Sequence, residues 1–227
     1  MTGLMRVIAV LFVAGGVALG APARALAVSE TQQLVDKANL TASKLLNHKD
    51  FPQLKDWVKK AKGVFIVPSM LKAGFVIGAA GGSGILLARD KSGTWSAPAF
   101  YTIGAGSFGL QIGLEDSEIM FVVMTDKGMK ALINNEVKLG AKASIAVGPI
   151  GAGIEGATTL GLGRDIYAFS KGVGLYGGIA LEGAWIKKRN SYNTDYYGKN
   201  ASPRAILIDR KFNNPGADKL RALLDIR

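Results

Sequence analysis

The chain has 227 residues, no cysteine and one histidine, and its 28 basic and 17 acidic residues give a net charge of +11. Without cysteine, disulfides, thiolate chemistry and a cysteine-linked lipid anchor are excluded. The positive charge favours an anionic partner, such as nucleic acid, acidic polysaccharide or phospholipid, although a solvated basic surface without a partner would carry the same charge.

Residues 1–27 have the pattern of a cleavable secretory signal peptide. Arg6 precedes an apolar run over Val7–Ala21, and Ala25-Leu26-Ala27 places small residues at a cleavage site. The run is shorter than the roughly 20 apolar residues of a membrane-spanning helix, although an uncleaved N-terminal anchor is the alternative. Cleavage would remove two arginines and leave residues 28–227 with 26 basic and 17 acidic residues, a net charge of +9. We therefore expect a periplasmic or secreted protein.

Two helices are expected in the helical segment 28–62. Apolar residues recur at helical spacing from Ser29 to Asn47, and Ser29 with Gln32 fits a capping box. A second, short helix is expected over Gln53–Ala61. The apolar faces of the two helices include Leu34, Leu45, Leu46 and Trp57.

The segment 63–189 is expected to be a strand-rich core. The expected strands are Val64–Val67, Phe75–Ile77, Gly84–Ala88, Trp95–Ile103, Ser107–Leu114 and Ile119–Met124, with two or three more between Ala143 and Trp185. Pro68 is expected to end the first strand, and Glu115–Ser117 to separate two later ones. One helix, capped by Asp126, is expected over Asp126–Asn134.

The segment 190–227 is expected to be a polar tail that ends in a weak helix over Ala217–Leu224. Short turns between strands indicate antiparallel pairing, and helices gathered towards the ends indicate the α+β class. The many strand glycines favour a tightly bent sheet. We therefore expect a single domain in which N-terminal helices pack on a glycine-rich, antiparallel, curled or barrel-like sheet.

The chain has little catalytic equipment. His48, the single histidine, lies in a polar loop, and a zinc site would need several His or Cys ligands. Three glycine triplets match a dinucleotide-binding fingerprint: Gly104/Gly106/Gly109, Gly151/Gly153/Gly156 and Gly172/Gly174/Gly177. That motif works where a strand ends and a helix begins, but here strand-like alternation continues. We expect no enzyme activity, no cofactor and no metal.

Lysines cluster around the two N-terminal helices, and with one tryptophan they form the candidate lipid-binding set. The set is Lys37, Lys44, Lys55, Trp57, Lys59, Lys60 and Lys62. Basic residues beside an apolar face are typical of a surface that binds phospholipid headgroups. In the alternative, the leucines and the tryptophan pack on the sheet and the lysines are solvated. Spacing alone favours this second arrangement.

A series of short segments shares the order and spacing of one family. The segments are Ala61–Pro68, Gly74 with Gly78–Gly84, Trp95–Phe100, Ser107–Gly113, Gly148–Gly151, Tyr167–Gly172, Leu181–Gly183 and Tyr196–Gly198. Together they resemble the SYLF domain, also called the Ysc84 or lipid-associated SYLF domain, and the signal peptide resembles that of exported bacterial members.

This resemblance implies a phospholipid-binding module. Eukaryotic members bind phosphoinositides through a basic amphipathic N-terminal helix, and some associate with actin. The resemblance adds Lys171 to the candidate set, since Ala168–Gly172 matches a basic stretch of the family with one basic residue fewer. The first helix balances Lys37 and Lys44 with Glu30 and Asp36.

The sequence therefore predicts non-catalytic binding of anionic phospholipid at a membrane surface by an exported, peripherally associated protein. Neither nucleic acid nor actin is expected as a partner in that compartment, whereas a protein partner is compatible with the chain. One alternative is an envelope scaffold or stress protein that acts through protein contacts. Another is an integral outer-membrane barrel, although Ile119–Met124 is apolar on both faces, unlike the strands of such barrels.

Overall fold

The computed structural model describes residues 28–74, 77–108, 113–134, 136–147, 163–171, 181 and 183–226. The predicted signal peptide lies outside the described residues, as do the second and third glycine triplets. In the described part, none of the helices combines the length and the apolar composition that crossing a bilayer requires.

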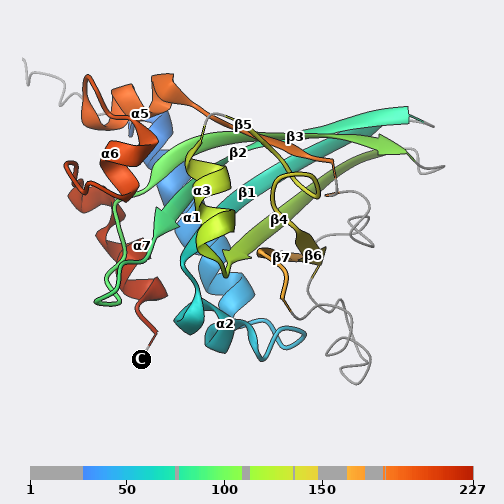
Figure 1. The fold of residues 1–227 in the computed structure, drawn as a ribbon. Helices are drawn as coiled ribbons and strands as arrows, with labels where there is room; N and C mark the ends of the chain where they lie inside the picture. The colour runs from blue at the N-terminus through green and yellow to red at the C-terminus, as the bar shows by residue number, and fades with distance from the viewer. Residues whose placement is uncertain are drawn as a thin grey trace, which may run out of the picture.

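An eight-stranded sheet forms the centre of the molecule, in the order β5-β8-β3-β2-β1-β4-β7-β6 (Figure 1). The strands are β1 (Gly63–Gly74), β2 (Ile77–Ala88), β3 (Ala99–Phe108), β4 (Gly113–Val123), β5 (Glu136–Lys138), β6 (Ile145–Val147), β7 (Ile166–Lys171) and β8 (Trp185–Lys188). Neighbouring strands pair antiparallel except for β6 and β7, which are parallel. The antiparallel sheet with N-terminal helices confirms the predicted α+β class.

The sheet curls because its two edges are joined by a short connection. β5 and β6 stand at opposite ends of the strand order, yet only residues 139–144 lie between them. Such a connection spans at most about 25 Å, whereas seven strand spacings in a flat sheet would separate the edges by roughly 34 Å. The predicted curled sheet is therefore confirmed, and it is visible in Figure 1.

Helices lie on both faces of this sheet. They are α1 (Glu30–Leu46), α2 (Leu54–Lys60), α3 (Asp126–Ile133), α5 (Asn190–Tyr197), α6 (Pro203–Leu207) and α7 (Asp218–Leu224), with a 3-10 turn, η1 (Pro215–Ala217), before the last. In Figure 1, α1 lies behind the sheet and α3 in front of it. We call the face that α1 covers the outer face and the face towards α3 the inner face.

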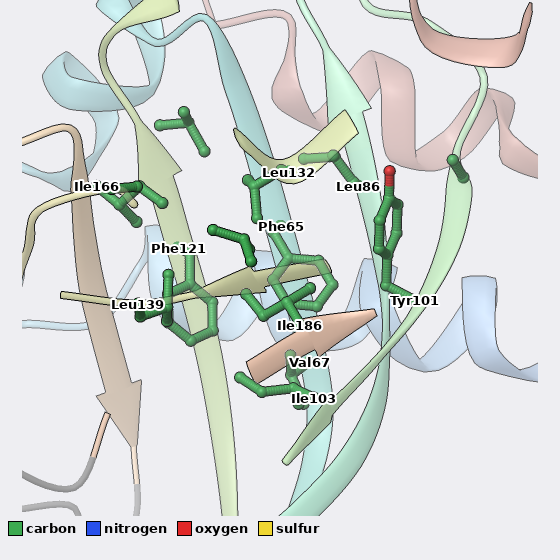
Figure 2. Packing of buried hydrophobic residues seen from close by; sticks show 14 of the residues in the cluster. Phe65, Val67, Leu86, Tyr101, Ile103, Phe121, Leu132, Leu139, Ile166 and Ile186 are labelled. Carbon is green, nitrogen blue, oxygen red and sulfur yellow. The ribbon is translucent and has the colours of Figure 1, made fainter. Parts of the chain in front are cut away.

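Apolar side chains are buried on both faces of the central strands. On the inner face Phe65, Tyr101 and Phe121 surround Leu132 of α3 (Figure 2). On the outer face a second cluster joins α1, α2 and α7 to the sheet through residues such as Ile66. Successive residues of a strand point to opposite faces, so strands with cores on both sides need continuous apolar sequence.

Several predicted strand boundaries are wrong because cross-strand pairing overrides local sequence. β1 continues through Pro68 by way of a β-bulge, where the register with β2 shifts between Ile66 and Ser69. A bulge tolerates proline because the ladder there lacks a regular hydrogen bond. The glycine run 78–84 lies inside β2, and Glu115–Ser117 lies inside β4.

Two helix predictions also need correction. Asp126 is not the cap of α3, because the Thr125 Oγ1 accepts the Gly128 N–H at 3.0 Å. The tail contains a helix, α5, that its polar sequence does not predict. The side-chain oxygen of Asn193 accepts the Phe100 N–H at 2.9 Å, which fixes this helix on β3.

Candidate functional site

The first helix packs its apolar face on the outer face of the sheet. Its N-cap is formed as predicted, since Ser29 Oγ accepts the Gln32 N–H at 3.2 Å. Leu45 and Leu46 are buried, and Leu34 is partly buried against the same core. Of the two arrangements left open by the sequence, the structure therefore shows the packed one, in which α1 has no free apolar face.

Trp57 of α2 also faces the sheet. Its ring meets Tyr167 edge-on with centroids 4.1 Å apart and lies 5.8 Å from Phe169. The side chain is partly buried in the outer core. In this packing the indole contributes to the folded core and offers little surface to a bilayer.

The lysines of α1 stay exposed on the flank of the helix. Lys44 Nζ donates to Glu118 Oε1 at 2.7 Å, and the Thr41 hydroxyl reaches the same carboxylate oxygen at 3.1 Å. Lys37 precedes Thr41 by four residues, so it lies on the same side of the helix. The α1 lysines therefore border the part of the outer face that carries Glu118.

The lysines around α2 form a second exposed group. Lys55 Nζ donates to Asn47 Oδ1 at 3.0 Å, and Lys59 lies 3.9 Å from Asp56. Lys60 and Lys62 are exposed as well. Exposed ion pairs of this kind are weak and are screened by salt, so these ammonium groups remain available to an external anion.

Lys171 is the last residue of β7, and its backbone pairs with that of Glu118. This places the residue in the same cross-strand register as the carboxylate that Lys44 contacts. The strand thus brings Lys171 near the α1 lysines in backbone position, level with the bulge in the middle of β1, whereas the α2 lysines lie before the start of β1.

The structure adds cationic residues that the sequence reasoning missed. Lys62 Nζ lies 3.9 Å from Asp126 Oδ1, which brings the start of α3 next to the end of α2. Lys127 follows on α3, and the exposed Arg164 precedes β7 at the same end of the sheet. We call Lys59, Lys60, Lys62, Lys127 and Arg164 the basic end. Only the tertiary fold reveals it, because three separate segments contribute.

Asp165 holds the basic end together. Its carboxylate accepts hydrogen bonds from the Thr125 hydroxyl at 2.6 Å and from the Ser144 N–H and hydroxyl, both at 2.9 Å. Lys127 Nζ lies 3.2 Å away. Burial would raise the pKa of Asp165, but these hydrogen bonds outweigh burial and lower the pKa to about 2. The residue is a structural junction between α3, β6 and β7.

The described residues give no support to metal or nucleotide chemistry. They contain no group of three or more His, Asp or Glu side chains placed to hold a metal ion. Gly104 and Gly106 of the first glycine triplet lie inside β3. A surface cavity of about 450 Å³ beside Trp95 and Arg221 is open and contains Asp218, which pairs with that arginine. The exposed lysines are therefore the strongest candidate site.

Comparison with known proteins gives one family and several relatives. Residues 104–226 match the family model Ysc84, described as "Las17-binding protein actin regulator". LAS seventeen-binding protein 3 of Saccharomyces cerevisiae is 34% identical over 175 residues, which cover 76% of this chain and 38% of the relative. SH3 domain-containing YSC84-like protein 1 of Homo sapiens is 34% identical over 169 residues, 74% of this chain and 49% of the relative. The chain thus spans half or less of the length of these relatives.

Proposed function

We propose that this chain, which belongs to the Ysc84 (SYLF) family, binds anionic phospholipid headgroups at a membrane surface without catalysing a reaction. One observation carries the proposal: α1 and α2 bury their apolar faces in the sheet while their lysines remain exposed. In this folded state the contact with headgroups is therefore electrostatic. The candidate lysines are Lys37, Lys44, Lys55, Lys59, Lys60, Lys62 and Lys171.

The energetics of such a contact follow from the number of lysines near the bilayer. Each lysine near an anionic membrane contributes about 1 kcal/mol, and the attraction falls off within a Debye length of about 8 Å at physiological salt. Three or four lysines at the surface would supply about 3–4 kcal/mol, which corresponds to a few hundredfold in partitioning.

Vesicle binding tests the proposal directly. We expect co-sedimentation with phosphatidylglycerol-containing vesicles that rises with the anionic fraction and falls as salt is raised. Replacing Lys37 and Lys44 with Gln should weaken binding at least tenfold, because the flank of α1 then loses about 2 kcal/mol of attraction. Lys199→Gln with Lys211→Gln changes exposed lysines elsewhere and serves as the control. Equal binding to neutral and anionic vesicles, or binding to neither, would refute the proposal.

The proposal also places the protein in the periplasm or in secreted form, at the membrane surface. Its support is the signal-peptide pattern of residues 1–27. Expression in a bacterial host followed by N-terminal sequencing of the exported chain should find Val28 first. Retention of Met1 in a cytoplasmic fraction would refute this part of the proposal while leaving headgroup binding open to the vesicle test.

A second candidate function is binding to another protein. It is favoured by the family description and by relatives that are named for binding Las17. For this chain the partner would be an envelope protein rather than actin, since the proposed compartment lacks actin. A stoichiometric partner recovered without lipid from the envelope fraction would favour this candidate over headgroup binding.

A further inference from the structure

The outer face of the sheet continues beyond the part that α1 covers. In Figure 1, the ends of β1 to β4 project away from the helices. On this projecting part, Leu71, Gly81, Gly104 and Trp185 lie in register across the neighbouring strands β1, β2, β3 and β8. We call these four residues the outer strip. Leu71 is 49% exposed and Trp185 41% exposed.

Strand alternation places the strip on the same face as α1. Phe100 of β3 packs in the outer core, and Gly104 lies four residues further along the strand, hence on the same face. Ile186 of β8 is buried in the inner core, so its neighbour Trp185 points to the outer face. The strip is therefore a direct continuation of the surface on which α1 packs.

Trp185 lies against the backbone of Gly104. A Cβ at Gly104 would stand 2.3–2.9 Å from three atoms of the indole ring, so only glycine permits this contact. At Gly81, the nearest described atom to such a Cβ is the Ile103 carbonyl oxygen at 3.6 Å, and side chains leave this position open. The strip is thus shallow at Gly81, where no side chain stands above the backbone. Leu71 and Trp185, its two large apolar side chains, lie on the two sides of this glycine.

Cationic residues stand around the strip. Lys187 lies two residues after Trp185 on the same face, and Lys138 of β5 pairs with Trp185 across the strands; both are exposed. Lys44, on the flank of α1 that also carries Lys37, contacts Glu118 of β4, two residues from the Asp116 that pairs with Leu71. The acids of this region are Asp116, which is exposed and opposite Leu71, Glu136, which stands in register with Lys187, and Glu118, which is paired with Lys44. The four lysines thus outnumber these three acids, and the rim carries a small positive excess.

We propose that the outer strip is the surface that enters the bilayer interface, with Trp185 and Leu71 at the level of the lipid headgroups and the first carbons of the acyl chains. Lys37, Lys44, Lys138 and Lys187 then face the phosphates. Tryptophan and lysine are the side chains that favour this depth. The inference rests on the proposed function and names its apolar contact, which the buried faces of α1 and α2 do not provide. Other exposed large apolar residues, such as Leu40 and Ile208, lie on separate helical segments.

Tryptophan fluorescence with brominated lipids tests the strip. Trp95 is buried and donates its indole N–H to Leu224 O at 2.9 Å, and Trp57 packs on Tyr167, so Trp185 is the indole most open to solvent. Vesicles of phosphatidylglycerol and brominated phosphatidylcholine should quench the wild-type chain. The Trp185→Phe variant should show little quenching. The Leu71→Ser variant should bind about tenfold more weakly, because one apolar side chain is removed from the interface.

Matched variants separate this inference from the proposed function. Lys187→Gln should weaken vesicle binding about fivefold, whereas Lys199→Gln, with the same change in charge, should leave binding unchanged. Circular dichroism would establish that each variant is folded. Anionic-dependent binding with equal quenching of wild type and Trp185→Phe would overturn the strip and leave the proposed function standing. Absence of vesicle binding would overturn both. A protein partner that shields Trp185 from iodide without lipid would show instead that the strip is a protein interface.

Discussion

The two halves of the outer face differ although the same strands build them. Under α1, the outward positions of β1, β2 and β3 carry Ile66, Ile85 and Phe100, all buried. Beyond α1, the corresponding positions carry Leu71, Gly81 and Gly104. A strand position that a helix covers gains free energy from a large apolar side chain, whereas an uncovered one exposes that side chain to water. The size of the outward-facing side chains along these strands therefore marks where α1 stops covering the outer face.

This contrast gives a structural reason for the strand glycines, and it sets apart the two large apolar residues on the open half. Gly104 and Gly106 belong to the uncovered half of β3 rather than to a nucleotide-binding turn. Leu71 and Trp185 stand out because they are large, apolar and uncovered. On the helix-covered half such residues would be ordinary core members. On the open half they need a separate explanation, which the proposed bilayer contact would supply.

Matched leucine variants give the largest expected contrast between the halves. Leu45→Ala removes a fully buried side chain between α1 and the sheet, and it should lower the free energy of unfolding by about 2–5 kcal/mol. Leu71→Ala on the open half should lower it by less than about 1 kcal/mol, because the side chain is half exposed. Urea denaturation followed by circular dichroism measures both. Similar losses would show that the open half is covered in solution.

Asp165 tests how firmly the basic end is fixed. Asp165→Asn places an amide N–H₂ against the donors of Thr125 and Ser144 and should cost about 2–3 kcal/mol. Asp116→Asn, on the exposed part of β4, is the control and should change stability by less than about 0.5 kcal/mol. A cost below 1 kcal/mol at position 165 would contradict the junction role.

The same carboxylate predicts a pH dependence. Its folded-state pKa of about 2 lies below the ordinary value of 3.8, so folding favours the ionised form. The stabilisation is complete above about pH 4 and is lost as the pH falls towards 2. Thermal melts between pH 5 and pH 2 should therefore show a steeper loss for the wild type than for Asp165→Asn. Parallel curves would contradict the assignment.

Alanine at two neighbouring glycines tests the surface of the open half. Gly104→Ala should displace the Trp185 ring and cost about 1 kcal/mol, because the new Cβ occupies the position of indole atoms. At Gly81, the new Cβ meets no atom of the described residues closer than 3.6 Å, so Gly81→Ala should be neutral. Iodide quenching should rise in the first variant and stay constant in the second. If iodide quenching changes in neither variant, the Trp185 ring does not lie against Gly104.

A buried hydroxyl gives the smallest expected effect. The Tyr101 hydroxyl has no hydrogen-bond partner among the described residues, and burial raises its pKa. Tyr101→Phe should therefore change stability by no more than about 0.5 kcal/mol, or increase it. Tyr197→Phe is the comparison, since that hydroxyl donates to Pro98 O at 2.7 Å, and its loss should cost about 1 kcal/mol.

Local sequence pattern predicts those parts of the fold that local structure determines. The periodicity of α1 predicts both its bounds and its buried leucines, and Ser29 marks its start. By contrast, Pro68 suggests a strand end, but pairing with β2 and β4 carries β1 past it through a bulge. α5 has a polar sequence and depends on the bond between Asn193 and Phe100, which no local pattern indicates.

The candidate site likewise has parts that local sequence predicts and parts that only tertiary contacts create. The exposure of the α1 and α2 lysines follows from helical spacing, because they lie opposite the apolar face. The basic end and the outer strip do not, since each joins segments far apart in the chain. Asp165 follows a glycine-rich stretch and has no sequence feature that sets it apart; its role depends on contacts with Thr125 and Ser144.

The connection between β5 and β6 also affects how the protein avoids aggregation. Unpaired edge strands offer backbone groups to other chains, and long flat edges promote intermolecular β-pairing. In the described sheet, both edge strands have three residues, against ten to twelve in β1 to β4. The parts of the long strands that β8 and β7 pair with, 101–104 of β3 and 118–123 of β4, are thus kept in the interior of the sheet, and the residues 139–144 hold the two short edges together. Short edges of this kind leave little backbone free for pairing with another copy of the chain.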